Sequence, residues 1–123
     1  PECAAAHYNL GMALKAQKDL PGAEAAYRRA LEARPDDADA LCNLGDLLRE
    51  RGGAARLREA EDLLRRSVAL DPGNSITTHN LGSMLWQKGD LAEAERMYRK
   101  ALELDPNYTT ANIALKNLLA AKK

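Results

Sequence analysis

The sequence has no phenylalanine, and aromatic residues make up only 4% of its 123 positions. Strong helix formers such as Ala, Leu, Glu, Arg and Lys dominate, whereas β-branched residues are few. A chain that is 46% hydrophobic with so few rings must build its core from Ala and Leu side chains, which suits closely packed helices. We therefore expect an all-α protein with almost no strand.

An excess of charge of one sign is also absent, because 18 basic and 18 acidic side chains cancel. The two signs are interleaved along the chain, so no long-range field is available to attract phosphates. This pattern argues against nucleic acid as a partner. The lysines Lys116, Lys122 and Lys123 near the end of the chain have no acid beside them, and cations there favour the negative end of a helix dipole.

Cysteines and long apolar runs are scarce. Cys3 and Cys42 make no metal-ligand spacing with His7 or His79, so we interpret them as reduced thiols of an intracellular, cytoplasmic protein, with a disulfide left open. No apolar run approaches the ~20 residues of a membrane span, and no charged-then-apolar leader is present, so we expect no membrane partner. Because the chain starts without Met, we expect a segment of a longer protein.

One short pattern, Asn-Leu-Gly, is present three times. Gly11 is followed by Gly45 after 34 residues and by Gly82 after a further 37. Self-similarity at this period indicates a stacked array of helix pairs. We predict one domain with repeats at residues 4–37, 38–74 and 75–108, followed by a capping helix at 109–123.

Each repeat carries the same residue types at matching positions, with Leu and Gly on a first helix and then a small residue, a large residue and Pro on a second. The matching residues are His7, Leu10, Gly11, Leu14, Ala23, Tyr27, Ala30 and Pro35; Leu41, Leu44, Gly45, Leu48, Ala60, Leu64, Ser67 and Pro72; and Thr78, Leu81, Gly82, Leu85, Ala94, Tyr98, Ala101 and Pro106. This arrangement resembles the tetratricopeptide repeat family. The resemblance implies an α-solenoid, a right-handed superhelix of three helix-turn-helix hairpins plus a C-terminal capping helix.

Glycine inside a helix costs about 1 kcal/mol relative to Ala, so a packing gain must offset it. We expect Ala23, Ala60 and Ala94 to face the three glycines, and Tyr27, Leu64 and Tyr98 to fill the space between neighbouring hairpins.

Local signals mark where the helices start and stop. Proline ends each second helix, and the residue pairs Asp36 and Asp37, Asn74 and Ser75, and Asn107 and Thr109 supply candidate caps for the next helix. Three extra residues near Gly52 and Gly53 predict a longer turn, either a tolerated lengthening or a contribution to binding.

In the family that the chain resembles, the first helices line a concave groove in which partner peptides bind. Carried over by position, the groove residues are Tyr8, Asn9, Met12, Asp39, Asn43, Asp46, Arg49, Ile76, Asn80, Ser83 and Trp86. Two interpretations of Asn9, Asn43 and Asn80 stay open, because these amides can either hold a peptide backbone or bridge adjacent helices. Trp86 can likewise contact a ligand or lie half-buried against the capping helix.

Some family members hold a C-terminal carboxylate of chaperones with basic and amide side chains in this groove. Only Asn43 matches that set here, because the other positions hold Tyr8, Met12, Ile76 and Asn80. The sequence instead favours apolar anchoring beside mixed charges, which suits a peptide or helix with some basic character.

Catalytic and cofactor signals are missing from the sequence. The two histidines and two cysteines have no partners at the spacing of a metal or acid–base site, and no phosphate-binding glycine loop follows a strand. We therefore expect no enzyme activity, cofactor or metal, and a non-catalytic interaction module as the function. Two alternatives stay open: a targeting or substrate-recruiting region of a larger enzyme such as a glycosyltransferase, and an array that self-associates weakly through its uncapped N-terminal repeat.

Overall fold

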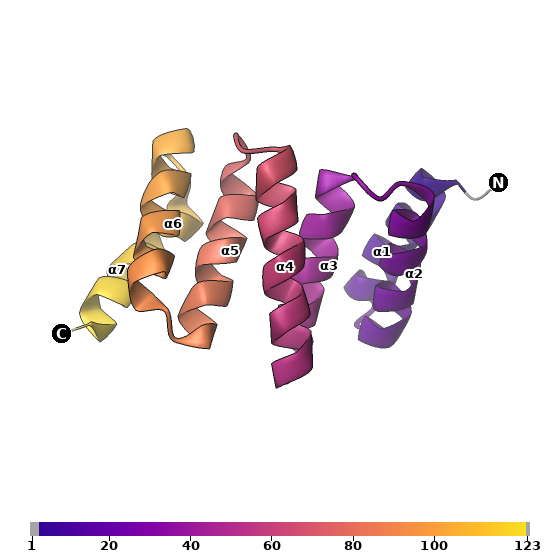
Figure 1. The fold of residues 1–123 in the computed structure, drawn as a ribbon, viewed down its shortest axis with the longest axis horizontal. Helices are drawn as coiled ribbons and strands as arrows, with labels where there is room; N and C mark the ends of the chain where they lie inside the picture. The colour runs from indigo at the N-terminus through magenta and orange to yellow at the C-terminus, as the bar shows by residue number, and fades with distance from the viewer. Residues whose placement is uncertain (1–2, 123) are drawn as a thin grey trace. The chain divides into compact units, whose positions relative to one another are not determined.

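The computed structural model describes residues 3–122, and every regular element in that range is an α-helix. The helices are α1 (Ala4–Ala16), α2 (Leu20–Ala33), α3 (Ala38–Arg51), α4 (Ala54–Leu70), α5 (Ser75–Lys88), α6 (Leu91–Leu104) and α7 (Thr109–Ala121) (Figure 1). This confirms the expected all-α helical-repeat fold. None of these helices is long and apolar enough to cross a bilayer.

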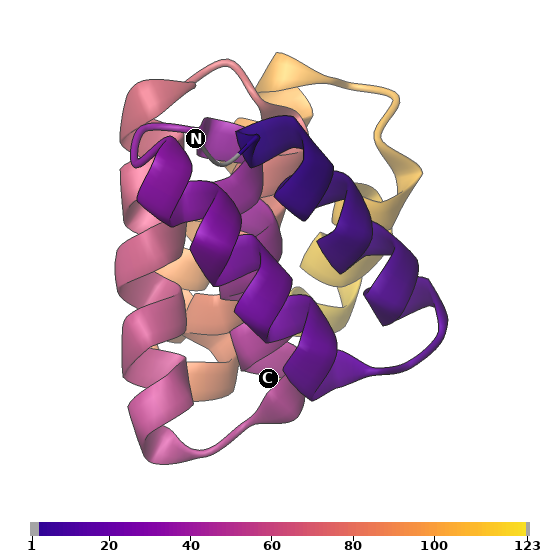
Figure 2. The same cartoon turned by 90° about the vertical axis from the view of Figure 1, so that its right-hand side faces the viewer.

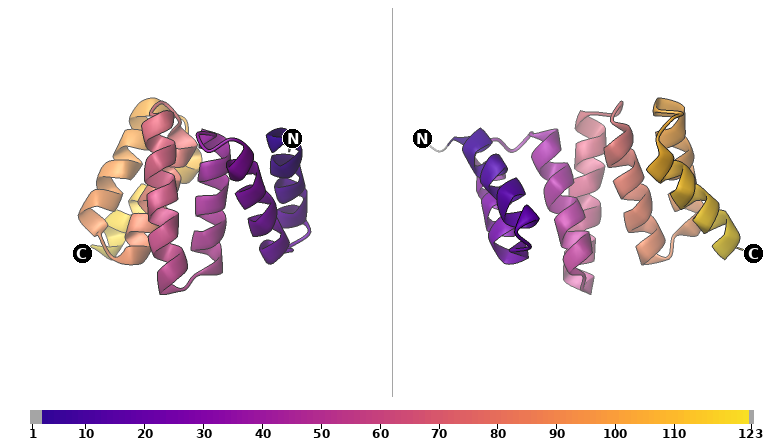
Figure 3. Two further views of the ribbon diagram at one scale, coloured as in Figure 1. Left: turned by 45° about the vertical axis from the view of Figure 1, so that its right-hand side comes forward. Right: turned by 180° about the vertical axis from the view of Figure 1, so that it is seen from behind.

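The helices group into two compact units, residues 1–70 and 71–123. In the first unit, α1 pairs with α2 and α3 pairs with α4 as antiparallel hairpins, and α2 packs against α3 (Figures 2 and 3). In the second unit, α5 pairs with α6, and α7 packs on α6 and also touches α5. The prediction of one domain and of a right-handed superhelix concerns both units together and stays a prediction.

The predicted starts of the helices are confirmed at two of three repeat boundaries. The Asp37 and Asn74 carboxylate and amide oxygens accept hydrogen bonds from backbone N–H groups in the first turns of α3 and α5. The prediction for the third boundary was wrong, because Tyr108 precedes α7 and supplies no side-chain cap. Asn107 instead donates its backbone N–H to Asp105.

The helical glycines lie against large side chains, and Gly45 also lies against the backbone of Ala60, as expected. A Cβ atom added at Gly11 would lie 2.6 Å from the Tyr27 ring, and one added at Gly82 would lie 2.9 Å from the Tyr98 ring. Both rings are 1% exposed. Each second-helix tyrosine therefore lies over the glycine of its own hairpin, and glycine makes room for the ring. Tyr27 also lies beside Asn43 of the next hairpin.

The three extra residues of the second repeat lengthen a helix, not a turn. Only Gly52 and Gly53 separate α3 from α4, while α4 has 17 residues against 14 in each of α2 and α6. Both glycines have positive φ, 77° and 94°, a conformation open to glycine, and this permits the short turn. The long α4 is visible in Figure 1.

The last helix covers unit 2 with only part of its apolar surface. Leu118 is 0% and Leu115 8% exposed, as expected for a cap. Ile113 and Leu119 on the same helix are 54% and 36% exposed. Polar Lys116 lies exposed at the position that Gly11 occupies in α1.

Candidate functional site

The candidate site in the first unit lies where Asn43 on α3 reaches Tyr8 on α1, beside the ring of Tyr27. The Tyr8 ring packs against Tyr27 with centroids 6.0 Å apart. Asn43 on α3 donates a hydrogen bond through its Nδ2 to the Tyr8 hydroxyl oxygen at 2.7 Å. The amide of Asn43 therefore joins the first helices of two successive hairpins.

A groove of about 340 Å³ opens beside this hydrogen bond, lined by Met12, Lys15, Ala16, Tyr27 and Asn43. Met12 is 48% exposed, so it offers an apolar surface to solvent. We call Tyr8, Met12, Lys15, Tyr27 and Asn43 the first-helix groove. Its floor is the buried Tyr27, which sequence reasoning had assigned to packing alone.

The Tyr8 hydroxyl and the Asn43 amide of this groove form hydrogen bonds as uncharged groups. Burial and the nearby negative charge of Asp39 raise the pKa of the Tyr8 phenol, and the hydrogen bond from Asn43 opposes this rise. Tyr8 therefore stays protonated at neutral pH. Within the part of the chain that the structure describes, neither its hydroxyl hydrogen nor the Oδ1 of Asn43 has a partner.

Charged residues border the groove, and most of them are already paired. Asp46 accepts a hydrogen bond from Arg49 at 2.7 Å and lies 3.6 Å from the Lys15 ammonium. Asp39 and Glu50 are exposed. Of the acids tied to this groove, Asp46 is already paired, and Asp39 is close enough to Tyr8 to raise the pKa of its phenol.

The asparagines at the repeated position differ in their surroundings. Asn43 is half-buried and bridges two helices, whereas Asn9 is exposed and makes no side-chain hydrogen bond among residues 3–122. In the second unit, the Asn80 Oδ1 lies 3.2 Å from the His79 Nδ1. Asn43 and Asn9 thus differ although their sequence positions are equivalent, and an aligned ladder of all three amides stays a prediction.

The second unit places an aromatic cluster on the corresponding helix, α5. The His79 ring lies 5.5 Å from Tyr98 and 5.5 Å from Tyr108, between centroids. The Ser83 hydroxyl lies 3.0 Å from the Tyr98 hydroxyl. Ser83 therefore belongs to this cluster, and its place in a binding groove stays a prediction.

Trp86 and Ile76 lie on the same helix. Trp86 is half-buried and meets the Tyr98 ring of α6 edge-on at 6.3 Å, and a contact with a ligand stays a prediction. Ile76 is 55% exposed. This surface therefore combines rings, a hydroxyl and one exposed aliphatic side chain.

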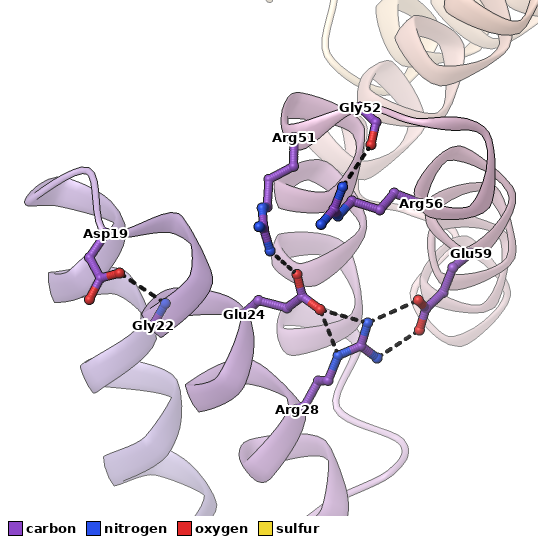
Figure 4. A network of polar contacts seen from close by, with 8 residues as sticks. All are labelled: Asp19, Gly22, Glu24, Arg28, Arg51, Gly52, Arg56 and Glu59. Atoms are coloured by element: carbon purple, nitrogen blue, oxygen red, sulfur yellow. Dashed lines mark hydrogen bonds and ion pairs between the residues drawn. The ribbon is translucent and has the colours of Figure 1, made fainter.

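A network of ion pairs lies outside both surfaces and was missed at the sequence level (Figure 4). Arg28 on α2 donates to Glu59 on α4 at 2.7 and 2.9 Å, and to Glu24 at 3.0 Å. Arg51 at the end of α3 donates to Glu24 at 2.6 Å. The four-residue spacing of Glu24 and Arg28 indicated their helical pair, but the contact with Glu59 requires the tertiary fold.

Metal sites do not emerge from the described residues, where no group of three or more His, Cys, Asp or Glu side chains is placed to hold an ion. Cys3 is exposed and Cys42 buried, and neither forms a disulfide within the described residues.

Comparison with known proteins shows which repeat family these hairpins match. Models of the tetratricopeptide repeat match residues 4–37 and 79–108, and a second model of the same repeat matches residues 26–61. The TPR repeat-containing protein PA4667 of Pseudomonas aeruginosa is 32% identical over 104 residues, which cover 85% of this chain and 17% of that protein.

Two solved structures are similar over almost the whole chain. An O-GlcNAc transferase mutant from Thermobaculum terrenum is 34% identical with a TM-score of 0.88, covering 94% of this chain and 22% of the transferase chain. The first TPR of Spaghetti (RPAP3), bound to an HSP90 peptide, has a TM-score of 0.88 at 22% identity and covers 96% of this chain and 91% of its own. Because the second match is only 22% identical, it supports the fold alone.

Proposed function

Because the chain belongs to the tetratricopeptide repeat family, we propose that it is a non-catalytic protein-interaction module that binds a peptide or helix of a partner protein. Each unit offers its own binding surface, which is the first-helix groove in unit 1 and the surface of Ile76, Asn80, Ser83 and Trp86 in unit 2. The observation that carries the proposal is the Tyr8–Asn43 pair, which leaves a donor and an acceptor beside an open groove. A similar domain, the first TPR of RPAP3, has been solved with a bound peptide.

The groove suits the backbone of a peptide better than a charged group. The Tyr8 hydroxyl can donate to a peptide carbonyl, and the Asn43 Oδ1 can accept from a peptide N–H, whatever the peptide sequence. Met12 adds an apolar contact, and Asp39 and Glu50 favour a partner with some basic character. Free Cys3 and Cys42 suit an intracellular setting.

A matched set of variants tests this surface. A peptide is first selected on the wild-type chain from a random display library and then titrated by fluorescence anisotropy against N43A, N80A and N9A. We expect N43A and N80A to weaken binding at least fivefold, and N9A, whose side chain makes no hydrogen bond, to weaken it less than twofold. If N43A and N80A both bind the peptide with unchanged affinity, this surface is not the peptide-binding site.

The similarity to an O-GlcNAc transferase favours a second candidate, a substrate-recruiting region of a larger glycosyltransferase. That match is 34% identical, and the chain spans 22% of the transferase chain. Sequencing the complete reading frame tests this candidate. A catalytic domain in the same frame would support it, and a frame encoding only further helical repeats would exclude it.

A further inference from the structure

A second groove of unit 1 lies between α2 and α4, the second helices of the two hairpins. Its volume is about 400 Å³. The walls come from α2 and α4, and the floor comes from Leu41 and Leu44 on α3, which are 0% and 1% exposed. Because its walls are second helices, this groove is separate from the surface proposed above, and we call it the second-helix groove.

The lining changes in character along the groove. At one end, Arg28 and Glu59 close it with paired hydrogen bonds of 2.7 and 2.9 Å. One helical turn further, Leu31 and Leu63 line it with apolar surface. At the other end, Arg66 on α4 lies beside Pro35 on the chain that follows α2. The groove thus runs from a closed ion pair, through an apolar section, to a cation.

The two arginines differ in how far they are already paired. Arg28 has two carboxylate partners, Glu59 and Glu24. Arg66 is exposed, and its one contact among residues 3–122 is a long hydrogen bond of 3.5 Å to the carbonyl oxygen of Pro35. A carboxylate in that place would form a charge-assisted bond of about 2.8 Å, which is shorter and stronger. Arg66 is therefore the lining cation left available to an acidic partner.

The spacing of the apolar and cationic sections matches one turn of a helix. Leu63 and Arg66 are three residues apart on α4, a rise of about 4.5 Å along its axis. Side chains three or four residues apart on a partner helix are separated by about the same distance. Exposed Glu32 on the rim also lacks a partner within the described range, which disfavours a second acid on the α2 side.

We infer that the second-helix groove binds a helix of a partner protein that inserts a leucine between Leu31 and Leu63 and places a carboxylate, one turn away, on Arg66. The leucine fills the apolar section, and the carboxylate replaces the long bond to Pro35. Together they select an apolar–acidic helix, in contrast to the partly basic partner proposed for the first-helix groove. The chain would then be able to hold two partners on opposite helices of unit 1.

Synthetic helical peptides test the inference. Two capped 15-residue alanine–glutamine peptides carry one Leu and one Glu, with the Glu four residues before or after the Leu, and are titrated into the intact chain by NMR. We expect one of them to bind saturably and to shift the amides of Leu31, Leu63 and Arg66. R66E should weaken that binding at least tenfold, and a peptide with Lys in place of Glu should recover binding to R66E.

Two controls isolate the site. R29E reverses an equally exposed charge on α2 outside the groove and should leave the affinity within twofold of wild type. N43A alters the first-helix groove and should also leave it unchanged. Circular dichroism checks that R66E folds, as its exposed side chain leads us to expect. Absence of saturable shifts for both peptides, equal affinity of R66E and wild type, or loss of binding in N43A would each overturn the inference.

Discussion

At the scale of single residues, Lys18 holds a backbone conformation that its side chain disfavours. Its φ is 66°, the one positive φ of a residue other than glycine in the described chain, and Gly89 occupies the equivalent position between α5 and α6. Replacing Lys18 by Gly relieves the strain, although it also gives the unfolded chain more freedom. We expect K18G to raise the free energy of unfolding by up to about 1 kcal/mol, measured by urea denaturation. The reverse change, G89K, should lower it, and a loss of stability in K18G would refute the strain argument.

Glycine at the centre of a hairpin is set by the ring that lies over it. A Cβ at Gly11 or Gly82 would meet the buried ring of Tyr27 or Tyr98 at 2.6 or 2.9 Å, so the ring or the helix would have to shift. Although alanine is normally the better helix former, G11A and G82A should each lose about 1–3 kcal/mol of unfolding free energy, because overpacking outweighs propensity. G73A is the control, since an added Cβ there meets nothing within 4 Å. Thermal melts in which G11A is as stable as wild type would contradict this account.

At the scale of helices, existence and type were predictable from sequence, whereas the placement of extra residues was not. Periodic Leu and Gly positions, the prolines and the Asp37 and Asn74 caps located the repeats. The insertion near Gly52 was expected in a turn because paired glycines usually mark one. Instead both glycines adopt positive φ and close a two-residue connection, so the extra residues extend α4. Sequence alone does not show whether inserted residues lengthen the turn or one of the two helices that it joins.

The ion network ties α2 to α3 and α4, and its strength should depend on pH. The hydrogen bond from Arg28 lowers the pKa of Glu59 below its ordinary value of 4.5, with burial acting in the opposite direction. A carboxylate with a lowered folded pKa stabilises the fold above its ordinary pKa, and this contribution is lost as the pH falls through the folded value. The wild-type chain should therefore exceed E59Q in stability at pH 7, and the difference should shrink as the pH falls below 4.5.

Urea midpoints measured from pH 7 to pH 3 test this dependence. E32Q, which changes an exposed glutamate that has no partner in the described residues, should follow the wild-type profile. A constant difference between wild type and E59Q across the whole range would show that the pair does not act through ionisation. Because both side chains are at least 40% exposed, the effect should be modest and should weaken in salt.

At the scale of the whole molecule, repeat register proposes positions for a candidate site but not the contacts between them. Repeat register identified Tyr8, Met12 and Asn43, and the structure brings them together at one groove. Register did not reveal that Asn43 bridges two helices while Asn9 does not, because that difference depends on which tyrosine lies opposite each amide. Equivalent sequence positions acquire different roles according to which hairpin precedes them.

One face of α1 is apolar and exposed within residues 3–122. Leu10 is 50% exposed, whereas Leu44 and Leu81 at the same repeat position are 1% and 2% exposed. The equivalents of Ala13 are also covered, since Leu47 is 0% and Met84 1% exposed. An apolar helix face of this kind favours contact with a second copy of the chain.

We therefore expect the chain to associate weakly and reversibly through the face of α1 that carries Leu10. Sedimentation equilibrium should show an average mass that rises with protein concentration for wild type and stays at the monomer value for L10K, because a lysine ammonium cannot be desolvated in an apolar contact without a partner. The matched control is I113K, which places the same charge on an aliphatic residue that is 54% exposed on α7. If I113K suppresses association as strongly as L10K, the contact is unspecific and this face of α1 has no special role. A monomer mass at every concentration of wild-type chain would exclude self-association altogether.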